Sequence, residues 1–446
     1  MSGSRGKPHV FVLGASGLIG HFVAADLARR GCEVVAVARS FEPAQRFGLG
    51  ESPVVEVPVV DLETAALARL LEEHRAEVVV NCIGVLQDGA GASTDDVHVA
   101  FIGRLVAAIQ SLARPILLIH IGVPGREEDD RTAFSLTKRE AERMLRGAGV
   151  PVAILRPGFV VAPAAYGGSA LLRALAALPM DLPAEETHRP FAAVAIEDIA
   201  ATVALLIEKW DGDDRGLNAN FDLVHPEPLS LRDVIDLFRA WLGQGSRRRL
   251  MLPRALLDLG ARAGDLAARL GWAPPIRTTA LAELRRGVAG DPGPWLEATR
   301  MAPRPIRRVL MDRPATVQEK WFARLYLLKP VVLATLVVFW CASGLIALTV
   351  AYDAAVAILT SRGFPAALAH AITVASSLLD IAVGIAIAVR RTCRAGLLAG
   401  IAVSAFYTIG AAVLTPDLWL EPLGALVKTG PAIILMMVAL ATLDQR

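Results

Sequence analysis

Short runs of β-branched residues alternate with longer amphipathic segments between residues 9 and 160. The runs read "HVFVL", "EVVAVA", "AEVVVN", "PILLIHI" and "VPVAIL". Strands that alternate with helices of 10–15 residues are typical of a parallel sheet covered on both faces. We therefore predict an α/β fold with a doubly wound parallel sheet.

The pattern changes near the C-terminus, where polar positions almost disappear. Only nine charged side chains occur between residues 331 and 443. About 20 apolar residues cross a bilayer core of ~30 Å, and four such stretches follow one another: 331–352, 366–389, 395–414 and 423–443. We predict an all-α bundle of four transmembrane helices. The alternative, a soluble domain, requires four nearly uncharged core helices in succession.

These two patterns suggest three domains. We predict an N-terminal α/β domain over 1–160, a small α/β extension over 161–320 and a membrane domain over 321–446. Residues 226–330 carry 19 Lys and Arg against 10 Asp and Glu, which suits the anionic surface of a cytoplasmic leaflet. The formal net charge of the chain is only +2, too small to suggest a nucleic-acid partner.

The basic residues around the apolar stretches predict an orientation. Lys320, Arg324 and Lys329 precede the first stretch, and 390–394 contains three arginines between the second and third. Cytoplasmic loops carry the excess of Lys and Arg. We expect a multi-pass protein of a bacterial inner membrane, with the N-terminal α/β domain and both termini in the cytoplasm.

A glycine pattern follows the first apolar run. Gly14, Gly17 and Gly20 lie between the predicted strand and an amphipathic helix. The first permits a sharp turn, the second lets the backbone approach a pyrophosphate, and the third lets the helix pack on the strand. The helix N-terminus offers free N–H groups to phosphates. The alternative is a tight turn without a ligand.

This spacing resembles the short-chain dehydrogenase/reductase superfamily, in particular its extended and atypical members, and implies an NAD(P)-binding Rossmann domain. Other segments fit the resemblance. They are "VVDLET", where we expect Asp61 and Leu62 at the end of a third strand, "NCIG", where we expect a turn beside the cofactor, and "RPG", where we expect a further turn. The resemblance places these residues at the cofactor: Gly14, Ser16, Gly17, Leu18, Ile19, Gly20, Arg39, Asp61, Leu62, Cys82, Ile83, Gly84, Lys138 and Pro157.

Arg39 bears on the choice of cofactor. It follows the second predicted strand, where NAD-specific folds carry an acidic residue for the ribose 2′-hydroxyl. An arginine suits a 2′-phosphate, so we expect NADP(H). The alternative is an ordinary surface arginine.

The catalytic positions depart from the superfamily pattern. In "FSLTK", Phe134 stands where the family carries tyrosine, and Gly122 stands where it carries serine; Lys138 remains. Loss of a general acid costs about 10²–10⁴-fold in rate. Two of three catalytic side chains are absent, and Lys138 is the one catalytic residue that the resemblance retains. The pattern resembles the NADPH-holding accessory subunit of respiratory complex I.

Three polar residues are candidates for a replacement proton donor. His120 lies on the strand face of Gly122, His98 precedes a helix, and Tyr166 follows the "RPG" strand. For each, the alternative is a packed or solvent-facing polar residue. Asp198, in "IEDIA", is expected at a helix N-terminus, without a catalytic role.

The C-terminal bundle resembles DoxX-like membrane domains. The whole chain resembles proteins that join an atypical short-chain dehydrogenase/reductase domain to a DoxX-like domain. This resemblance implies no substrate. Two functions stay open. One is an NADPH-dependent reductase of a lipophilic, quinone- or lipid-like substrate. The other is a non-catalytic NADPH-holding protein that supports a membrane redox complex. No metal site is expected.

One acid, Asp380, lies near the centre of the second predicted span. A charge there costs about 2.5–3.5 kcal/mol, so we expect it to be protonated, facing the bundle interior. His370 and Lys428 are too far along the axis to pair with it. The expected hydrogen-bond partners are hydroxyls of the third span: Ser404, Tyr407 or Thr408. Asp380 then has one of two roles. It binds a polar substrate head group or a proton, or it only holds neighbouring helices together through hydrogen bonds.

Overall fold

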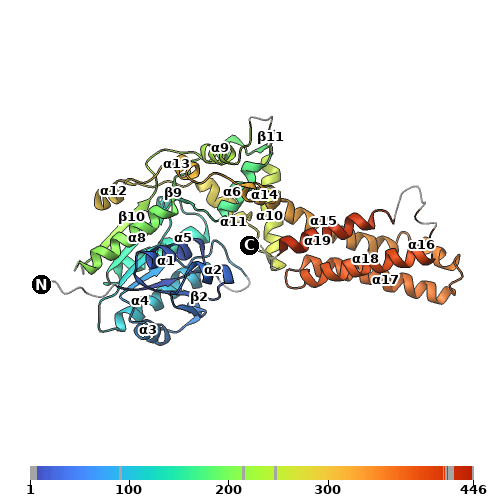
Figure 1. Ribbon diagram of the computed structural model, residues 1–446, viewed down its shortest axis with the longest axis horizontal. Helices are drawn as coiled ribbons and strands as arrows, with labels where there is room; N and C mark the ends of the chain where they lie inside the picture. The colour runs from blue at the N-terminus through green and yellow to red at the C-terminus, as the bar shows by residue number, and fades with distance from the viewer. Residues whose placement is uncertain are drawn as a thin grey trace. The chain divides into compact units, whose positions relative to one another are not determined.

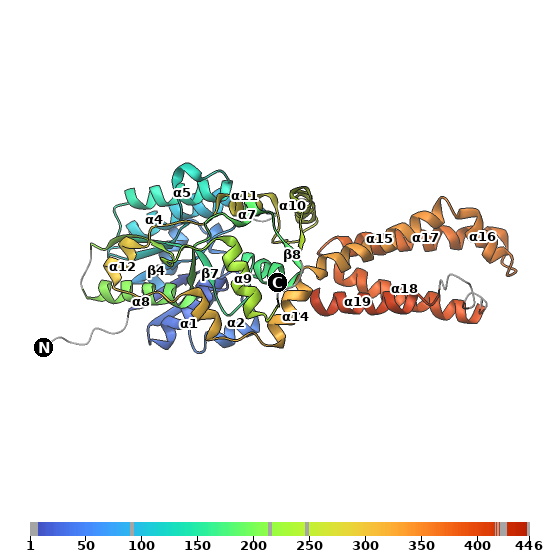
Figure 2. The same cartoon turned by 90° about the horizontal axis from the view of Figure 1, so that it is seen from above.

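The computed structural model of the chain forms two units. One comprises Met1–Gly264 and Pro275–Lys320, and the other comprises Asp265–Pro274 and Trp321–Arg446. Figures 1 and 2 show the course of the chain within each unit. The structure describes residues 8–89, 93–212, 216–245, 249–414, 416, 419 and 426–443.

A seven-stranded sheet forms the centre of the first unit. All of its strand pairs are parallel, and the order is β10-β6-β5-β4-β1-β2-β3. The strands are β1 (His9–Leu13), β2 (Glu33–Ala38), β3 (Val54–Glu56), β4 (Val78–Asn81), β5 (Leu117–Ile121), β6 (Val152–Pro157) and β10 (Asn218–Leu223). The strand order reverses beside β1, where ligands bind at the carboxyl ends of such sheets. The predicted doubly wound sheet is confirmed.

Helices cover both faces of this sheet, as Figure 2 shows for α1 and α8 on one side and α4 and α5 on the other. The first face packs on α1 (Leu18–Arg29), α8 (Ile196–Asp211) and α12 (Gly293–Thr299). The second packs on α3 (Thr64–Glu73), α4 (Phe101–Ser111) and α5 (Ala133–Gly147). Each fully buried Val, Leu or Ile contributes about 1.5–3 kcal/mol, so strands that are apolar on both faces require two helical layers.

The rest of the first unit is the small α/β extension that the sequence predicts. Two-stranded sheets pair β7 (Phe159–Val161) with β9 (Ala193–Ala195), and β8 (Met180–Asp181) with β11 (Leu250–Met251). Its helices, some of which continue into the second unit, are α6 (Gly168–Ala177), α7 (Ala184–Thr187), α9 (Leu231–Trp241), α10 (Arg254–Arg269), α11 (Thr278–Arg286), α13 (Ile306–Met311) and α14 (Val317–Tyr326). The remaining short helix, α2 (Pro43–Gly48), lies between β2 and β3.

The second unit is helical. Within the described residues, three helices are long and apolar enough to cross a membrane: α15 (Leu328–Leu348), α17 (Ala366–Ala388) and α18 (Cys393–Leu414). The fourth, α19 (Thr429–Leu443), is apolar but has 15 residues, and the predicted start of this span at 423 lies outside the described residues. A short helix that the apolar pattern does not predict, α16 (Tyr352–Thr360), connects α15 to α17.

The four long helices form a bundle. α15 packs on α17, α17 on α18, α18 on α19, and α19 on α15. Glycines allow the closest approach: a Cβ at Gly344 would overlap the Ser377 carbonyl, and one at Gly384 would overlap Cys341. Small residues at such crossings are typical of membrane helices. Phe339 and Phe406 are among the large apolar side chains on the outer surface, as lipid contact requires.

Candidate functional site

The glycine turn lies at the carboxyl end of β1. Gly14 has a φ of +76°, which favours glycine, and its N–H donates to the Val37 carbonyl at 2.9 Å. A Cβ at Gly20 would overlap the Gly14 carbonyl, so this glycine lets α1 pack against the turn. Leu18 and Ile19 hold the first turn of α1 against the core. In the described structure no side chain caps α1, so its first N–H groups suit an anion.

Two further candidate residues lie beside this turn. The carbonyl of Ser16 accepts a hydrogen bond from Gln45 Nε2 at 2.8 Å, which orients the loop. Arg39 is exposed directly after β2. Since β2 is the strand next to β1, Arg39 lies at the same carboxyl edge of the sheet as the glycine turn.

Asp61 and Leu62 do not end the third strand, so that prediction is wrong. β3 ends at Glu56, and residues 59–61 form a turn of 3₁₀-helix. The reason is a tertiary contact: Arg104 of α4 donates to the carbonyls of Val60 at 2.6 Å and Leu62 at 3.1 Å. The exposed Asp61 carboxylate remains at the carboxyl edge of the sheet.

The segment after β4 lies against the glycine turn. A Cβ on Gly14 would come within 3.1 Å of the Ile83 backbone N, and Cys82 N–H donates to the Leu13 carbonyl at 3.0 Å. Burial raises the pKa of the Cys82 thiol to about 12, so the thiol is neutral at ordinary pH. Asn81 Oδ1 accepts the Ile83 N–H at 3.1 Å and fixes this loop.

Lys138 is buried where these loops meet. Its Nζ donates to the carbonyls of Ile121 at 2.8 Å and Ile83 at 3.3 Å, and a Cβ on Gly84 would lie 3.3 Å from it. Burial lowers the pKa of Lys138 to about 8. One helical turn earlier, the partly exposed Phe134 ring packs edge-on against His98 at 5.7 Å between ring centroids.

A carboxylate fills the space at Gly122. A Cβ on this glycine would overlap Glu142 Oε1, and Glu142 is fully buried on α5. Its other oxygen accepts from Arg156 at 2.5 and 2.9 Å, from Arg146 at 3.1 Å and from Arg139 at 3.3 Å. The position where the superfamily carries serine therefore has no room for a side chain. Sequence reasoning missed this ionic cluster, although Arg139, Glu142 and Arg146 recur at helical spacing.

His98 has both ring nitrogens engaged. Nε2 accepts the Val85 N–H at 3.1 Å, so the proton lies on Nδ1, which is 2.8 Å from Thr137 Oγ1. Burial and the nearby Lys138 charge lower the pKa of His98 to about 3. A locked neutral imidazole does not act as a general acid at ordinary pH. His98 lies in a π-helical turn, residues 96–100, which opens α4.

His120 is neutral and buried on β5. Asn81 Nδ2 lies 3.2 Å from His120 Nδ1, and since the Asn81 oxygen already accepts from Ile83, the amide N–H donates to the ring. Burial lowers the pKa of His120 well below its ordinary value. Its Nε2 has no hydrogen-bond partner among the described residues.

Tyr166 and Asp198 are not on α5, the helix that carries Lys138. Tyr166 is exposed in the loop before α6. Asp198 is in the first turn of α8, as predicted, and accepts the Arg304 backbone N–H at 3.1 Å. Arg156 and Pro157 end β6 and do not form the turn that the "RPG" sequence suggests. In the part of the chain that the structure describes, no group of acidic, His and Cys side chains is arranged to hold a metal.

Two families match the chain. Residues 10–216 match the NAD dependent epimerase/dehydratase family, and residues 337–437 match the DoxX-like family. The chain joins an epimerase/dehydratase domain to a DoxX-like domain.

Two proteins are related to the epimerase/dehydratase domain in sequence. The mitochondrial NADH-ubiquinone oxidoreductase 40 kDa subunit of Neurospora crassa is 24% identical over 270 residues, which cover 60% of this chain and 68% of that protein. The dTDP-6-deoxy-L-talose 4-dehydrogenase (NAD(P)(+)) of Kitasatospora kifunensis is 33% identical over 116 residues, which cover 25% of this chain and 34% of that protein. The alignment thus spans only about a third of the second relative.

Solved structures show the same fold. UDP-glucuronic acid 4-epimerase from Bacillus cereus, in complex with UDP-glucuronic acid and NAD, matches with a TM-score of 0.51 at 15% identity, over 71% of this chain and 99% of that one. WbmG of Bordetella bronchiseptica, in complex with NAD, matches with a TM-score of 0.52 at 14% identity, over 70% of this chain and 94% of that one. At such identities the likeness concerns the fold alone.

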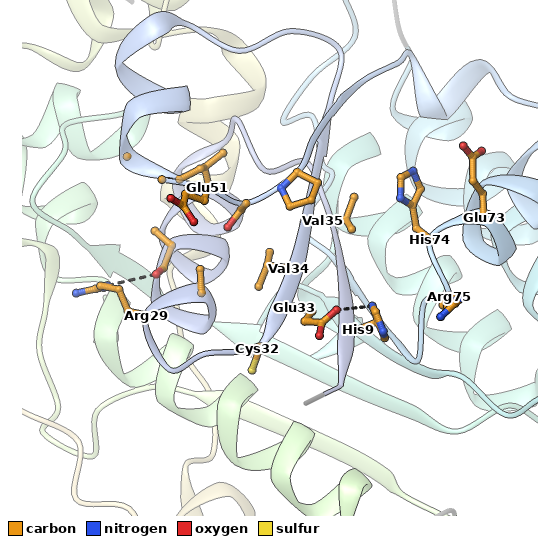
Figure 3. Close-up of a pocket in the computed structure, with 17 residues that line it drawn as sticks. His9, Arg29, Cys32, Glu33, Val34, Val35, Glu51, Glu73, His74 and Arg75 are labelled. Atoms are coloured by element: carbon orange, nitrogen blue, oxygen red, sulfur yellow. Dashed lines mark hydrogen bonds and ion pairs between the residues drawn. The ribbon is translucent and has the colours of Figure 1, made fainter. Parts of the chain in front are cut away.

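A hollow of about 870 Å³ opens elsewhere on the epimerase/dehydratase domain. Figure 3 shows His9 and Glu33 facing each other there, at the amino-terminal ends of β1 and β2. His9 Nδ1 lies 3.2 Å from Glu33 Oε2. Because the glycine turn lies at the opposite ends of these strands, the hollow is separate from the candidate cofactor site.

Asp380, on α17 of the DoxX-like domain, is buried, as expected. Tyr407 Oη donates to Asp380 Oδ1 at 3.2 Å, so α18 supplies one of the predicted hydroxyl partners. A second predicted partner, Thr408, instead donates to the Ser404 backbone carbonyl at 2.7 Å. At the end of α17 nearer α16, Tyr352 Oη lies 2.8 Å from His370 Nδ1.

Proposed function

We propose that the epimerase/dehydratase domain holds NADP(H) at the carboxyl edge of its sheet and that the DoxX-like domain keeps this cofactor at a membrane. The glycine turn and the uncapped α1 offer donors to a pyrophosphate. Arg39 suits the 2′-phosphate, and Asp61 and Leu62 lie on the adenine side. Residues 82–84, Lys138 and Pro157 border the nicotinamide side.

The cluster around Glu142 is the observation that favours holding over carbonyl reduction. Its carboxylate occupies the place of the superfamily serine, and Phe134 has no proton to donate. His98 and His120 are buried and neutral, with lowered pKa values. Carbonyl reduction needs a proton for the developing alkoxide. Among these neighbouring side chains only Lys138 carries a proton that can be donated near neutral pH, and its ammonium is already engaged with the Ile121 and Ile83 carbonyls. We therefore propose that the cofactor is bound without carbonyl reductase activity.

The DoxX-like domain supports a second function, the reduction of a lipophilic acceptor. The epimerase/dehydratase domain would hold NADPH as the hydride source. A quinone-like acceptor would take up that hydride together with one proton from water and would become a hydroquinone. No side-chain acid is required for this step. Apolar helices that cross a membrane bring the chain near lipophilic acceptors, and the likeness to a subunit of NADH-ubiquinone oxidoreductase supports a redox setting. The partner is then a lipophilic substrate or a membrane redox complex.

The proposal includes an orientation. Arg390 and Arg391 lie between α17 and α18, Arg394 lies in the first turn of α18, and Lys329 lies in the first turn of α15. By the excess of positive charge on the cytoplasmic side, we place the epimerase/dehydratase domain and both termini in the cytoplasm of a bacterial cell.

Titration of the purified full chain with NADPH and NADH tests the cofactor. Charge-assisted hydrogen bonds to the 2′-phosphate are worth about 1.5–3 kcal/mol, so NADPH should bind roughly ten- to hundredfold more tightly. Arg39→Ala should remove this preference. The matched control is Arg30→Ala, which removes the same charge at the far end of α1. Equal affinities in the wild type contradict the NADP(H) assignment.

Incubation of the NADPH-bound protein separates the two functions. We expect the cofactor to stay reduced in the presence of simple aldehydes and ketones. Oxidation by a soluble quinone supports the reductase function, and its absence supports the holding function. Turnover of simple carbonyls at ordinary enzyme rates contradicts the argument from Glu142 and Phe134.

A further inference from the structure

Helix α10 carries an apolar side that faces outward. Leu256, Leu259, Ala263, Leu266 and Leu270 recur at intervals of three and four residues, which places them on one side of a helix. The four leucines are 52%, 61%, 60% and 38% exposed, respectively. A helix of a soluble domain buries such a side, and large exposed apolar patches mark interaction surfaces.

The buried side of α10 is the side with the smallest residues. Ala261 and Gly264 are fully covered, and a Cβ on Gly264 would overlap the Ile276 carbonyl. The helix thus packs through small residues and directs its leucines away from the protein. Repacking the leucines inward would require replacing this close backbone contact.

The C-terminal end of α10 is bonded to the membrane bundle, within the second unit. Arg390 N–H donates to the Leu270 carbonyl at 3.0 Å, and Trp272 Nε1 donates to the carbonyl of Ala388 at 2.8 Å. The Arg390 guanidinium lies 5.5 Å from the centre of the Trp272 ring. Ala388 is the last residue of α17, so this contact lies where a spanning helix leaves the hydrocarbon. Tryptophan is enriched at that level.

The charged side of α10 suits an anionic surface. Arg254, Arg262 and Arg269 lie between its buried and its apolar sides, together with Asp258 and Asp265. Arg254 Nε lies 3.7 Å from Glu186 Oε1. Asp258 of the same stripe is neutralised by Arg285, with 2.9 Å between Oδ1 and Nη2. Arginines beside an outward leucine face are typical of helices that lie at a bilayer surface, where each basic residue gains from anionic lipid.

We propose that α10 lies in the plane of the anionic bilayer surface. Its leucines enter the boundary between head groups and acyl chains, and its arginines stay at the level of the lipid phosphates. Its 16 residues give a contact of about 24 Å at 1.5 Å per residue. The bilayer surface is thus a second lipid contact, in addition to the spans, and it does not depend on the proposed cofactor.

Accessibility of spin labels in the reconstituted full chain tests this arrangement. Cys32, Cys82, Cys341 and Cys393 are first replaced by alanine, and single cysteines are then introduced in separate variants. Leu259→Cys and Leu266→Cys probe the apolar side, and Arg262→Cys and Arg269→Cys are matched controls on the charged side. The vesicles contain phosphatidylcholine with phosphatidylglycerol.

We expect the ratio of oxygen to nickel-chelate accessibility to be several-fold higher at the two leucine positions than at the two arginine positions. The difference should shrink in phosphatidylcholine alone. Equal ratios at all four positions overturn the proposal. Protection of the leucine positions from both reagents also overturns it, because protein and not lipid then covers the face. An unchanged difference without phosphatidylglycerol overturns the role of the arginines.

Photocrosslinking of the unmodified chain provides a measurement without substitutions. Phosphatidylglycerol with a diazirine in its acyl chain is incorporated into the vesicles, and crosslinked peptides are identified by mass spectrometry. We expect adducts on residues 256–270 as well as on the spans. Adducts on α15, α17 and α18 without any on α10 contradict the proposal.

Discussion

Replacing Glu142 with glutamine tests the ionic cluster behind Gly122. Glutamine keeps the shape that fills this space and removes only the charge. The carboxylate oxygen now contacts Arg156 at 2.5 and 2.9 Å, Arg146 at 3.1 Å and Arg139 at 3.3 Å. Removing one partner of a buried ion pair costs about 3–5 kcal/mol, since the other charge remains buried.

The remaining contacts place the cost at the lower end of that range. Arg139 keeps Asp130 at 3.1 Å, Arg156 keeps Asp222 at 3.4 Å, and Arg146 is 40% exposed and is solvated instead. We therefore expect a loss of about 3 kcal/mol. With an unfolding entropy of about 2.1 cal/mol/K per residue over the roughly 300 residues of the first unit, the melting temperature of this unit should fall by about 5 °C.

This loss of stability can be measured by heating the full chain in detergent. The readout is the temperature at which the epimerase/dehydratase domain becomes susceptible to proteolysis. Glu140→Gln is the matched control, because Glu140 is on the same helix and pairs with Arg143 at 2.7 Å while both side chains are largely exposed. Exposed pairs contribute under about 1 kcal/mol. If both variants melt at the same temperature, the cluster does not stabilise the domain and the reasoning fails.

Three further predictions concern the two domains. Phe134→Tyr should be tolerated, whereas Gly122→Ser should lower the melting temperature, because its side chain overlaps Glu142; a fully stable serine variant would contradict the crowding. Burial lowers the pKa of Lys138 to about 8, so NADPH affinity should be constant below that pH and fall as pH rises through it, since the neutral amine is a weaker donor. Lys138→Arg should flatten this profile, and a flat wild-type profile refutes the role of the lysine. Asp380→Asn should fold and insert, and quinone reduction that loses its pH dependence in this variant identifies a proton site; an unchanged profile leaves only a contact between helices.

Local patterns in the sequence determine a large part of this protein. The runs of β-branched residues predict buried parallel strands, because a strand covered on both faces must be apolar at consecutive positions. Gly14, Gly17 and Gly20 predict the turn between β1 and α1, since each requirement is set within a few residues. The uncharged stretches predict membrane helices because length and polarity alone decide whether a segment crosses a bilayer.

Tertiary contacts decide the chemistry of the candidate site. The sequence shows that Gly122 lacks a hydroxyl, but only the packing of α5 against β5 shows that the Glu142 carboxylate fills that space. The same holds for His98, which contacts Thr137 of α5, and for His120, which contacts Asn81 of β4, since each partner is 39 residues away in the chain. Periodicity also places the α10 leucines on one side without telling whether that side is covered. Which atoms fill a space depends on elements distant in sequence, and a pattern along the chain carries no information about them.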